Sequence, residues 1–333
     1  NEEAFNVMLG IGDGTTVSNP KRRKFTAEHY FKSPEEMLEL FKDLPEATAN
    51  TLEIAKRCAF KVPLGTYYMP QWFKEDGDER TVDQIMVDEA KEAGIEHFIF
   101  VTGRGKTAIA DYFDHAYELE ETLSSKGKTQ ALNMLTEMRP RAGAASFLRQ
   151  QEPAGLGHAV WCARDLVGDE PFAVILADEL LKSSPGCLAQ MVEAYERTQG
   201  NVVGLVDVPK EHTDRYGVIK PGARDGKLVE VAGMIEKPKP DAAPSTLALV
   251  GRYILQPSVF DHLARQDRGA GGEIQLTDAM ARLIGNEPFH GLEFDGTRFD
   301  CGNKVGFMAA NVAYALERED MADELRAYLR SVI

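Results

Sequence analysis

Several features that would define other classes of protein are scarce or missing in this sequence. None of its 333 residues belongs to an apolar run of 18 or more, so no segment has the length of a membrane-spanning helix. Its four cysteines, Cys58, Cys162, Cys187 and Cys301, are scattered and form no CxxC pair. The segment 1–5 lacks the basic start and apolar stretch of a secretory leader. We therefore expect a cytoplasmic protein with no membrane partner.

Positive charge is also scarce. Lys and Arg number 38 against 53 Asp and Glu, which gives a formal net charge of −15. Non-specific binding to nucleic acid depends on an excess of Lys and Arg, so we expect no nucleic-acid partner. The 43% hydrophobic content supports a substantial core, and the length suits two average domains or one large domain. Whether the chain forms a homo-oligomer stays open.

From Val87 onward, helical stretches alternate with short apolar runs, which predicts an α/β fold with a mainly parallel central sheet. Apolar composition predicts strands at 97–101, 172–177, 202–206 and 247–255. Apolar residues at three- and four-residue spacing predict helices at 157–166, 187–197, 274–283 and 304–318, the last being the final long helix.

The chain before Gln84 has a different character. It contains two predicted helices, 33–41 and 47–59, followed by a segment rich in proline, aromatic and acidic residues at 63–80. That segment predicts a linker, so we place a domain boundary between a first region, 1–84, and a second, 85–333.

Two acids follow predicted strands in the second region. Asp178 comes directly after 172–177, and Asp300 follows the strand-like run 291–294. Ligands of α/β sheets bind at the carboxyl ends of strands, and two carboxylates from different loops suit Mg²⁺, which prefers oxygen ligands. In isolation, Asp178 fits a helix cap or a turn equally well.

A glycine-rich turn, 149–159, leads into a predicted helix. Its glycines allow a close approach of the backbone to a base or a phosphate, and the amide of Gln150 can pair with a pyrimidine edge. Glycine turns before helices are more often structural, and His158 fits a helix start better than a ligand.

A charged turn, 235–240, contains Glu236 beside Lys237 and ends regular structure with two prolines. The carboxylate suits sugar hydroxyls and the ammonium suits a phosphate, although a solvated turn is the simpler interpretation. The basic loop 102–106 suits a phosphate in the same way, although exposed surface charge is the simpler interpretation.

In this order, the segments resemble those of the bacterial UTP–glucose-1-phosphate uridylyltransferase family over residues 86–333. The segments that carry the resemblance are VDEAKEAGIEHFIFVTGRGK (87–106), RQQEPAGLGHAV (149–160), RYGVI (215–219), IEKPKP (235–240), LVGRYIL (249–255), GAGGEIQLTDA (269–279) and FDCGNKVGF (299–307). One departure is Glu179, which stands where many relatives have another residue.

The resemblance implies a Rossmann-like nucleotidyltransferase that uses Mg²⁺ to make UDP-glucose from UTP and glucose 1-phosphate. The sugar phosphate would attack the α-phosphorus of UTP, with Asp178 and Lys237 as catalytic residues. The implied roles are uracil binding by Gln150, Gly155 and Gly157, metal binding by Asp178 and Asp300, and binding of the sugar phosphate by Gly217, Glu236 and Lys237.

Family members begin with a buried central strand, a GxGTR phosphate loop and a PKEM segment, none of which precedes Val87. The resemblance therefore implies that the neighbours of this first strand have unpaired edges, unless the segment 5–11 takes the place of that strand. It also implies that loss of the phosphate loop impairs activity. The turn within 7–16 has only a superficial likeness to GxGTR.

Residues 1–83 instead resemble the end of the PHP region of the DNA polymerase III α subunit, in 1–37 and 40–63. This stretch holds one histidine, His29, too few for a PHP metal site. Two further hypotheses follow: an inactive relative that binds sugar nucleotides, and a spurious fusion of two genes.

Overall fold

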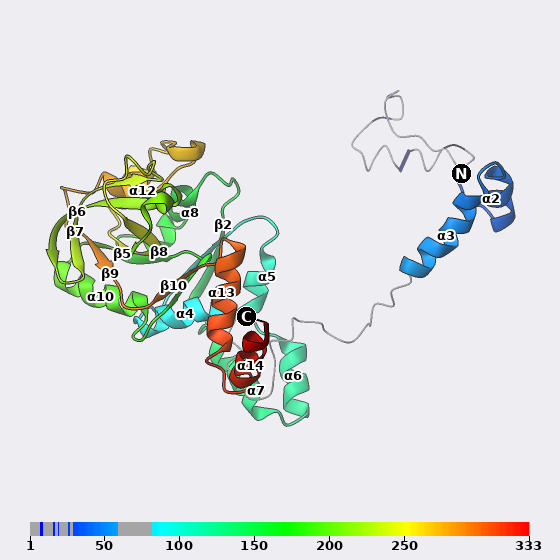
Figure 1. Cartoon of the computed structure of the whole chain (residues 1–333), viewed down its shortest axis with the longest axis horizontal. Coiled ribbons are helices and arrows are strands. Elements are labelled where there is room, and N and C mark those ends of the chain that lie inside the picture. Colours follow the sequence, from blue (N-terminus) through cyan, green and yellow to red (C-terminus); the bar gives the residue numbers. More distant parts are fainter. Residues whose placement is uncertain are drawn as a thin grey trace. The chain divides into compact units, whose positions relative to one another are not determined.

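The computed structural model describes residues 7, 8, 16, 19, 26, 29–58 and 82–332. The chain divides into two compact units, Asn1–Pro70 and Gln71–Ile333 (Figure 1). The predicted linker at 63–80 lies outside the described residues, and the boundary at 84/85 stays a prediction. None of the helices in these described ranges is long and apolar enough to cross a membrane.

The first unit contains the two helices predicted there, α2 (Pro34–Leu40) and α3 (Pro45–Cys58). Ser33 caps α2: its hydroxyl accepts a hydrogen bond from the backbone N–H of Glu36, and the Glu36 carboxylate accepts one from the N–H of Ser33. From the segment 5–11, Val7 and Met8 are described, and both are helical.

The second unit alternates helices and strands, as the sequence predicted. Its strands are β1 (Phe98–Thr102), β2 (Ala145–Arg149), β3 (Phe172–Ile175), β4 (Glu179–Lys182), β5 (Asn201–Asp207), β6 (Gly217–Asp225), β7 (Leu228–Glu236), β8 (Leu247–Leu255), β9 (Phe289–Glu293) and β10 (Thr297–Asp300). Its helices are α4 (Val82–Glu92), α5 (Thr107–Tyr112), α6 (Tyr117–Ser125), α7 (Thr129–Met138), α8 (Leu156–Cys162), α9 (Arg164–Val167), α10 (Cys187–Thr198), α11 (Val259–Leu263), α12 (Leu276–Ala281), α13 (Lys304–Ala315) and α14 (Ala322–Val332), with 3₁₀ turns η1 (Lys210–Arg215) and η2 (Ala270–Gly272).

The central sheet confirms the α/β class but corrects the predicted strand directions. Its six strands have the order β3-β8-β5-β9-β7-β6. Only β5 and β9 pair in parallel, and the other pairings are antiparallel. The parallel pair β1–β2 and the antiparallel pair β4–β10 form separate two-stranded sheets. A strand that is buried on both faces is apolar throughout whichever way it runs, so composition did not reveal direction.

Helices cover both faces of this sheet. All nine residues of β8 are buried. Leu249 and Tyr253 pack in a core cluster with α8, α11 and α12, whereas Val250 and Ile254 pack in a second cluster with α4 and α10. The unit is therefore a three-layer α/β/α arrangement, in which the loops that follow the strands are held at fixed positions.

Strands β1 and β3 each have one neighbour in the described part of the chain, β2 for β1 and β8 for β3. Every residue of both strands is half-buried, although their sequences, FIFVT and FAVI, are typical of fully buried strands. The second edge of each strand has no strand partner in the described ranges, and the absence of the family's first strand stays a prediction.

Two helix predictions were wrong in detail. The single helix predicted at 157–166 is divided at Ala163 into α8 and α9. Helix α14 follows the helix that was predicted to be last. The charged residues before α14 were interpreted as the end of the final helix, so a further helix was not predicted.

Candidate active site

The two predicted metal ligands lie side by side because β4 and β10 pair. In this antiparallel pair Asp300 lies opposite Glu179, and the backbone N–H of Cys301 donates to the carbonyl of Asp178 at 2.7 Å. A Cβ atom placed on Gly302 would lie 3.1 Å from Oδ1 of Asp300 and 3.4 Å from Oδ2 of Asp178. Both carboxylates therefore border the same small space.

This pair suits a divalent cation by its donor atoms. Partial burial raises the pKa of Asp178, and the negative charges of Glu179 and Asp300 raise it further. A cation between Asp178 and Asp300 would offset that repulsion. Within the described ranges no group of three or more His, Cys, Asp or Glu is arranged so that it could hold a metal ion, and Mg²⁺ is commonly held by one or two carboxylates together with substrate phosphates.

A buried ion pair lies beside the carboxylates. Arg298 donates from Nε and Nη2 to both oxygens of Glu179, at 2.8 and 2.7 Å, and each side chain is 11% exposed. The backbone N–H of Gly251 donates to the same Glu179 carboxylate at 3.0 Å. The Arg298 guanidinium lies over the ring of Tyr216, 4.5 Å from its centre.

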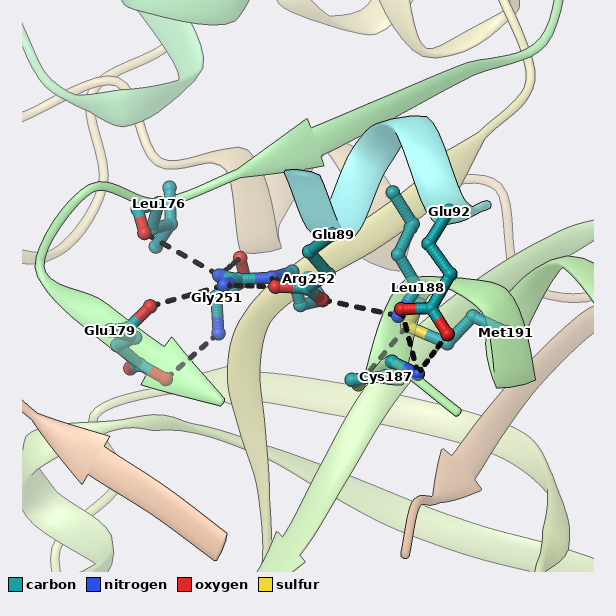
Figure 2. A network of polar contacts seen from close by, with 10 residues as sticks. Glu89, Glu92, Leu176, Glu179, Cys187, Leu188, Met191, Gly251 and Arg252 are labelled. Carbon is teal, nitrogen blue, oxygen red and sulfur yellow. Dashed lines mark hydrogen bonds and ion pairs between the residues drawn. The ribbon is translucent and has the colours of Figure 1, made fainter. Parts of the chain in front are cut away.

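The loop that carries Asp178 is also supported from the core (Figure 2). Arg252 on β8 is fully buried and donates from Nε and Nη2 to both oxygens of Glu89 on α4, at 3.0 and 2.8 Å. It also donates to the backbone carbonyls of Gly251 and Glu179, at 2.9 and 3.2 Å. One side chain thus joins α4, β8 and the residue after Asp178.

Glu236, Lys237 and Gly217 form a second group. Gly217 opens β6 opposite Glu236, which ends β7. A Cβ on Gly217 would lie 2.7 Å from Cδ1 of Leu249 and 3.2 Å from Oε2 of Glu236, so the position has no room for a side chain. Lys237 Nζ lies 3.6 Å from Oε1 of Glu236 and is 49% exposed.

Two hydroxyl groups complete this second group. Thr277 Oγ1 donates to Oε2 of Glu236 at 2.7 Å. The backbone carbonyl of Tyr216 accepts a hydrogen bond of 3.0 Å from the N–H of Lys237. The hydroxyl of Tyr216 donates to Oδ2 of Asp300 at 3.4 Å. Tyr216 therefore joins the second group to the carboxylate pair.

Gln150, Gly155 and Gly157 form a third group. The Nε2 of Gln150 donates to the carbonyl of Gly155 at 3.1 Å and lies 3.0 Å from Nδ1 of His158. Gly155 has φ of +115°, and a Cβ there or on Gly157 would approach the carbonyl oxygen of Ile274 within 2.8 Å. The glycines thus have a structural purpose, namely the close contact with the chain just before α12.

The structure therefore brings five of the eight predicted residues into two linked groups and places the other three in a separate group. Helix α12 follows Ile274 and carries Thr277, so it borders the second and third groups. Three further residues of the site, Tyr216, Thr277 and Arg298, were not predicted from the sequence. Tyr216 and Thr277 lie in segments that carry the resemblance, but a hydroxyl's hydrogen-bond partner depends on tertiary contacts. Arg104 and Lys106 are exposed, as the simpler interpretation of their loop predicted.

Comparison with known proteins places these groups in a family. The family model described as nucleotidyl transferase matches residues 62–317. A UTP–glucose-1-phosphate uridylyltransferase of Komagataeibacter xylinus is 49% identical over 227 residues, which cover 68% of this chain and 80% of the relative. One of Bacillus subtilis is 41% identical over 268 residues, which cover 80% and 91%.

A solved structure agrees with the sequence relatives. The UTP-bound UGPase of Acinetobacter baumannii superposes with a TM-score of 0.70 at 36% identity, covering 76% of this chain and 89% of that one. Nucleotidyl transferases generally use a divalent metal ion, which agrees with the paired carboxylates. The chain therefore belongs to the nucleotidyl transferase family and, within it, to the UTP–glucose-1-phosphate uridylyltransferases.

Proposed function

We propose that this chain transfers a uridylyl group from UTP to glucose 1-phosphate, which yields UDP-glucose and pyrophosphate. The observation that carries this function is the identity of 49% and 41% to two uridylyltransferases over most of their lengths. The site supports it chemically, because it combines a pair of carboxylates with an acid and a base that suit a sugar phosphate.

Gln150, Gly155 and Gly157 would bind the uracil. The Gln150 amide carries both a donor and an acceptor, as does the edge of a pyrimidine. Its Nε2 already donates to the glycine turn, so the amide is held in one orientation. The two glycines leave the turn without side chains, which lets a flat base approach the backbone.

Gly217, Glu236 and Lys237 would bind the glucose 1-phosphate. The Glu236 carboxylate suits sugar hydroxyls, and the half-exposed Lys237 ammonium suits the phosphate. Lys237 has φ of +46°, a conformation that costs a residue with a side chain about 1–2 kcal/mol. Such backbone strain is concentrated at functional sites, which supports a role for this turn.

In the reaction, a phosphate oxygen of glucose 1-phosphate forms a bond to the α-phosphorus of UTP. The bond from that phosphorus to the bridging oxygen breaks, and pyrophosphate leaves with the electron pair. Lys237 would orient the attacking phosphate and offset its charge. Asp178 and Asp300 would hold Mg²⁺, which when bound neutralises charge on the phosphates.

A test compares two neighbouring lysines. We expect the native chain with UTP, glucose 1-phosphate and Mg²⁺ to release pyrophosphate. Lys237→Met should lower kcat/KM by about 100-fold or more, since it removes a charged contact to the reacting phosphate. Lys239→Met, at an exposed position of the same turn, should stay within about threefold of native. Equal effects of the two changes would contradict the assignment of Lys237.

A second candidate function is binding of a sugar nucleotide without transfer. The half-buried strands β1 and β3, each with a single strand neighbour in the described part of the chain, favour it, because the resemblance implies that the family's first strand and its phosphate loop are missing. Calorimetry with UDP-glucose separates the two functions. Binding without pyrophosphate release would support the binder, whereas turnover would exclude it.

We further propose that residues 1–84 are a segment foreign to the nucleotidyltransferase at 85–333, and that 1–83 derive from a polymerase III α subunit; the family match, which begins at residue 62, bears against the position of this boundary. We also propose a cytoplasmic location, because the four scattered cysteines suit a reducing compartment. Sequencing of single long DNA molecules across the codons for 83–86 tests the foreign origin of the first segment. A junction seen in every molecule would support a natural chimera, and its absence would identify a spurious fusion.

A further inference from the structure

We propose that Glu179 and Arg298 are positioning residues that hold Asp178 and Asp300 in the arrangement that binds the metal. This inference rests on the proposed function, which assigns the metal to the two aspartates. Neither Glu179 nor Arg298 is itself assigned to a ligand.

The pairing of β4 with β10 brings the charged side chains of Glu179, Arg298 and Asp300 to the same side of the strand pair. Asp300 lies opposite Glu179, and Arg298 lies opposite Leu181. Residues two apart on a strand project from the same side, so Arg298 and Asp300 share one side of β10. Arg298 then reaches diagonally across the strand pair and donates two hydrogen bonds to the Glu179 carboxylate, which form a bidentate ion pair.

The arrangement would be unfavourable without the guanidinium. Glu179 follows Asp178 in the chain and faces Asp300 across the strands, so three carboxylates lie close together. Like charges that lie directly opposite each other destabilise a strand pair. Because Glu179 and Arg298 are each 11% exposed, water screens their charges weakly. Arg298 therefore neutralises Glu179 and leaves the two aspartates as the negative charges that face a cation.

The contacts of the ion pair also restrict both aspartates. The N–H of Gly251 holds the Glu179 carboxylate from the β8 side at 3.0 Å, which fixes the residue next to Asp178. On the other side the Arg298 guanidinium covers the Tyr216 ring, whose hydroxyl reaches Asp300. The ion pair thus includes Glu179, the residue next to Asp178 in the chain, and contacts Tyr216, whose hydroxyl hydrogen-bonds to Asp300. Groups that orient metal ligands in this way commonly affect metal affinity strongly.

The test measures metal binding directly. Mn²⁺ is titrated into the full chain with saturating UDP-glucose, and free Mn²⁺ is measured by electron paramagnetic resonance. We expect Glu179→Gln and Arg298→Gln to raise the Mn²⁺ Kd about tenfold or more. Arg298→Lys keeps the charge but loses the bidentate geometry, so it should recover part of the affinity.

A matched control is Arg318→Gln. Arg318 forms an ion pair with Asp320 at 3.0 Å, and the two side chains are 11% and 14% exposed, as at Arg298. The control should leave the Mn²⁺ Kd within about twofold of native, while thermal melting reports any loss of stability. Glu179→Asp, which keeps the charge, replaces any variant that fails to fold and should weaken Mn²⁺ binding by a smaller factor.

The outcomes separate the two proposals. Mn²⁺ affinity equal to native in the Glu179 and Arg298 variants, whatever their stability, would show that the ion pair is only a structural contact and would overturn this inference alone. If the native chain binds UDP-glucose but no Mn²⁺, both the metal assignment and the inference are wrong.

Discussion

The hydroxyl of Thr277 donates a hydrogen bond of 2.7 Å to Oε2 of Glu236. Thr277 is buried at the start of α12, and Glu236 is the last residue of β7. This contact joins the helix that borders the glycine turn to the strand end in the second group, which we propose binds glucose 1-phosphate. The other oxygen, Oε1 of Glu236, lies 3.6 Å from Nζ of Lys237.

Replacement of Thr277 by valine should therefore weaken binding of glucose 1-phosphate. Valine keeps the shape but loses a hydrogen bond to a charged group, worth about 1.5–3 kcal/mol, so we expect KM for glucose 1-phosphate to rise about tenfold or more. KM for UTP should change far less. Thr277→Ser keeps the hydroxyl and should behave nearly as native. Steady-state kinetics with each substrate varied separately measure both effects, and an equal rise in both KM values would contradict a local role.

Replacement of Asp178 by asparagine should stabilise the chain while it removes activity. The pKa of Asp178 is raised in the folded chain, chiefly by burial, so folding disfavours its ionised form. The resulting penalty is present above the folded pKa and disappears as pH falls below the unfolded one. In chelator at pH 7–8 we expect Tm to rise by about 1–3 °C, a small value because Asp178 is only partly enclosed by protein and solvent still screens its carboxylate.

The Asp178→Asn stabilisation should vanish below about pH 3, where the carboxyl is protonated in both the folded and the unfolded chain. Asp241→Asn is the control, because its carboxylate is fully exposed, and its Tm should match native at every pH. A stabilisation that does not depend on pH would contradict the electrostatic explanation.

Replacement of Gly155 by alanine should destabilise the chain more than the same change at Gly226. Both glycines have positive φ, +115° and +61°. An added Cβ would lie 2.7 Å from the Ile274 carbonyl oxygen at Gly155, but it would meet nothing within 4 Å at Gly226. We expect losses of about 2–5 kcal/mol and about 1–2 kcal/mol, respectively, in the free energy of unfolding. Urea unfolding measures both, and equal losses would show that the contact with Ile274 is unimportant.

Replacement of Arg252 by methionine should cost about 3–5 kcal/mol, because it leaves Glu89 buried without its cation. The double variant Glu89→Leu, Arg252→Met removes both charges and should recover part of this loss. Recovery should be incomplete, because the N–H of Leu188 donates to Glu89 at 3.2 Å and would lose its acceptor, at a cost of about 1–3 kcal/mol. Denaturant unfolding of Arg252→Met, of Glu89→Leu and of the double variant measures the coupling, and purely additive losses would contradict it.

Much of the fold was predictable from local pattern. The four apolar runs predicted as strands all form strands, because such runs must be buried in an extended or helical element and their lengths suit strands. Strand direction was not predictable. Strand β8 is apolar along its whole length, yet it runs antiparallel to both β3 and β5.

The sequence by itself determined which family the chain resembles and which residues to examine, since Asp178, Asp300, Glu236 and Lys237 lie in segments of distinctive composition. Only the tertiary structure decided how these residues meet. The pairing of β4 with β10 brings together residues more than 100 positions apart in the chain, and Arg298 contacts Glu179 only because of that pairing. Local sequence specifies which element forms, but contacts between distant side chains depend on how the elements pack.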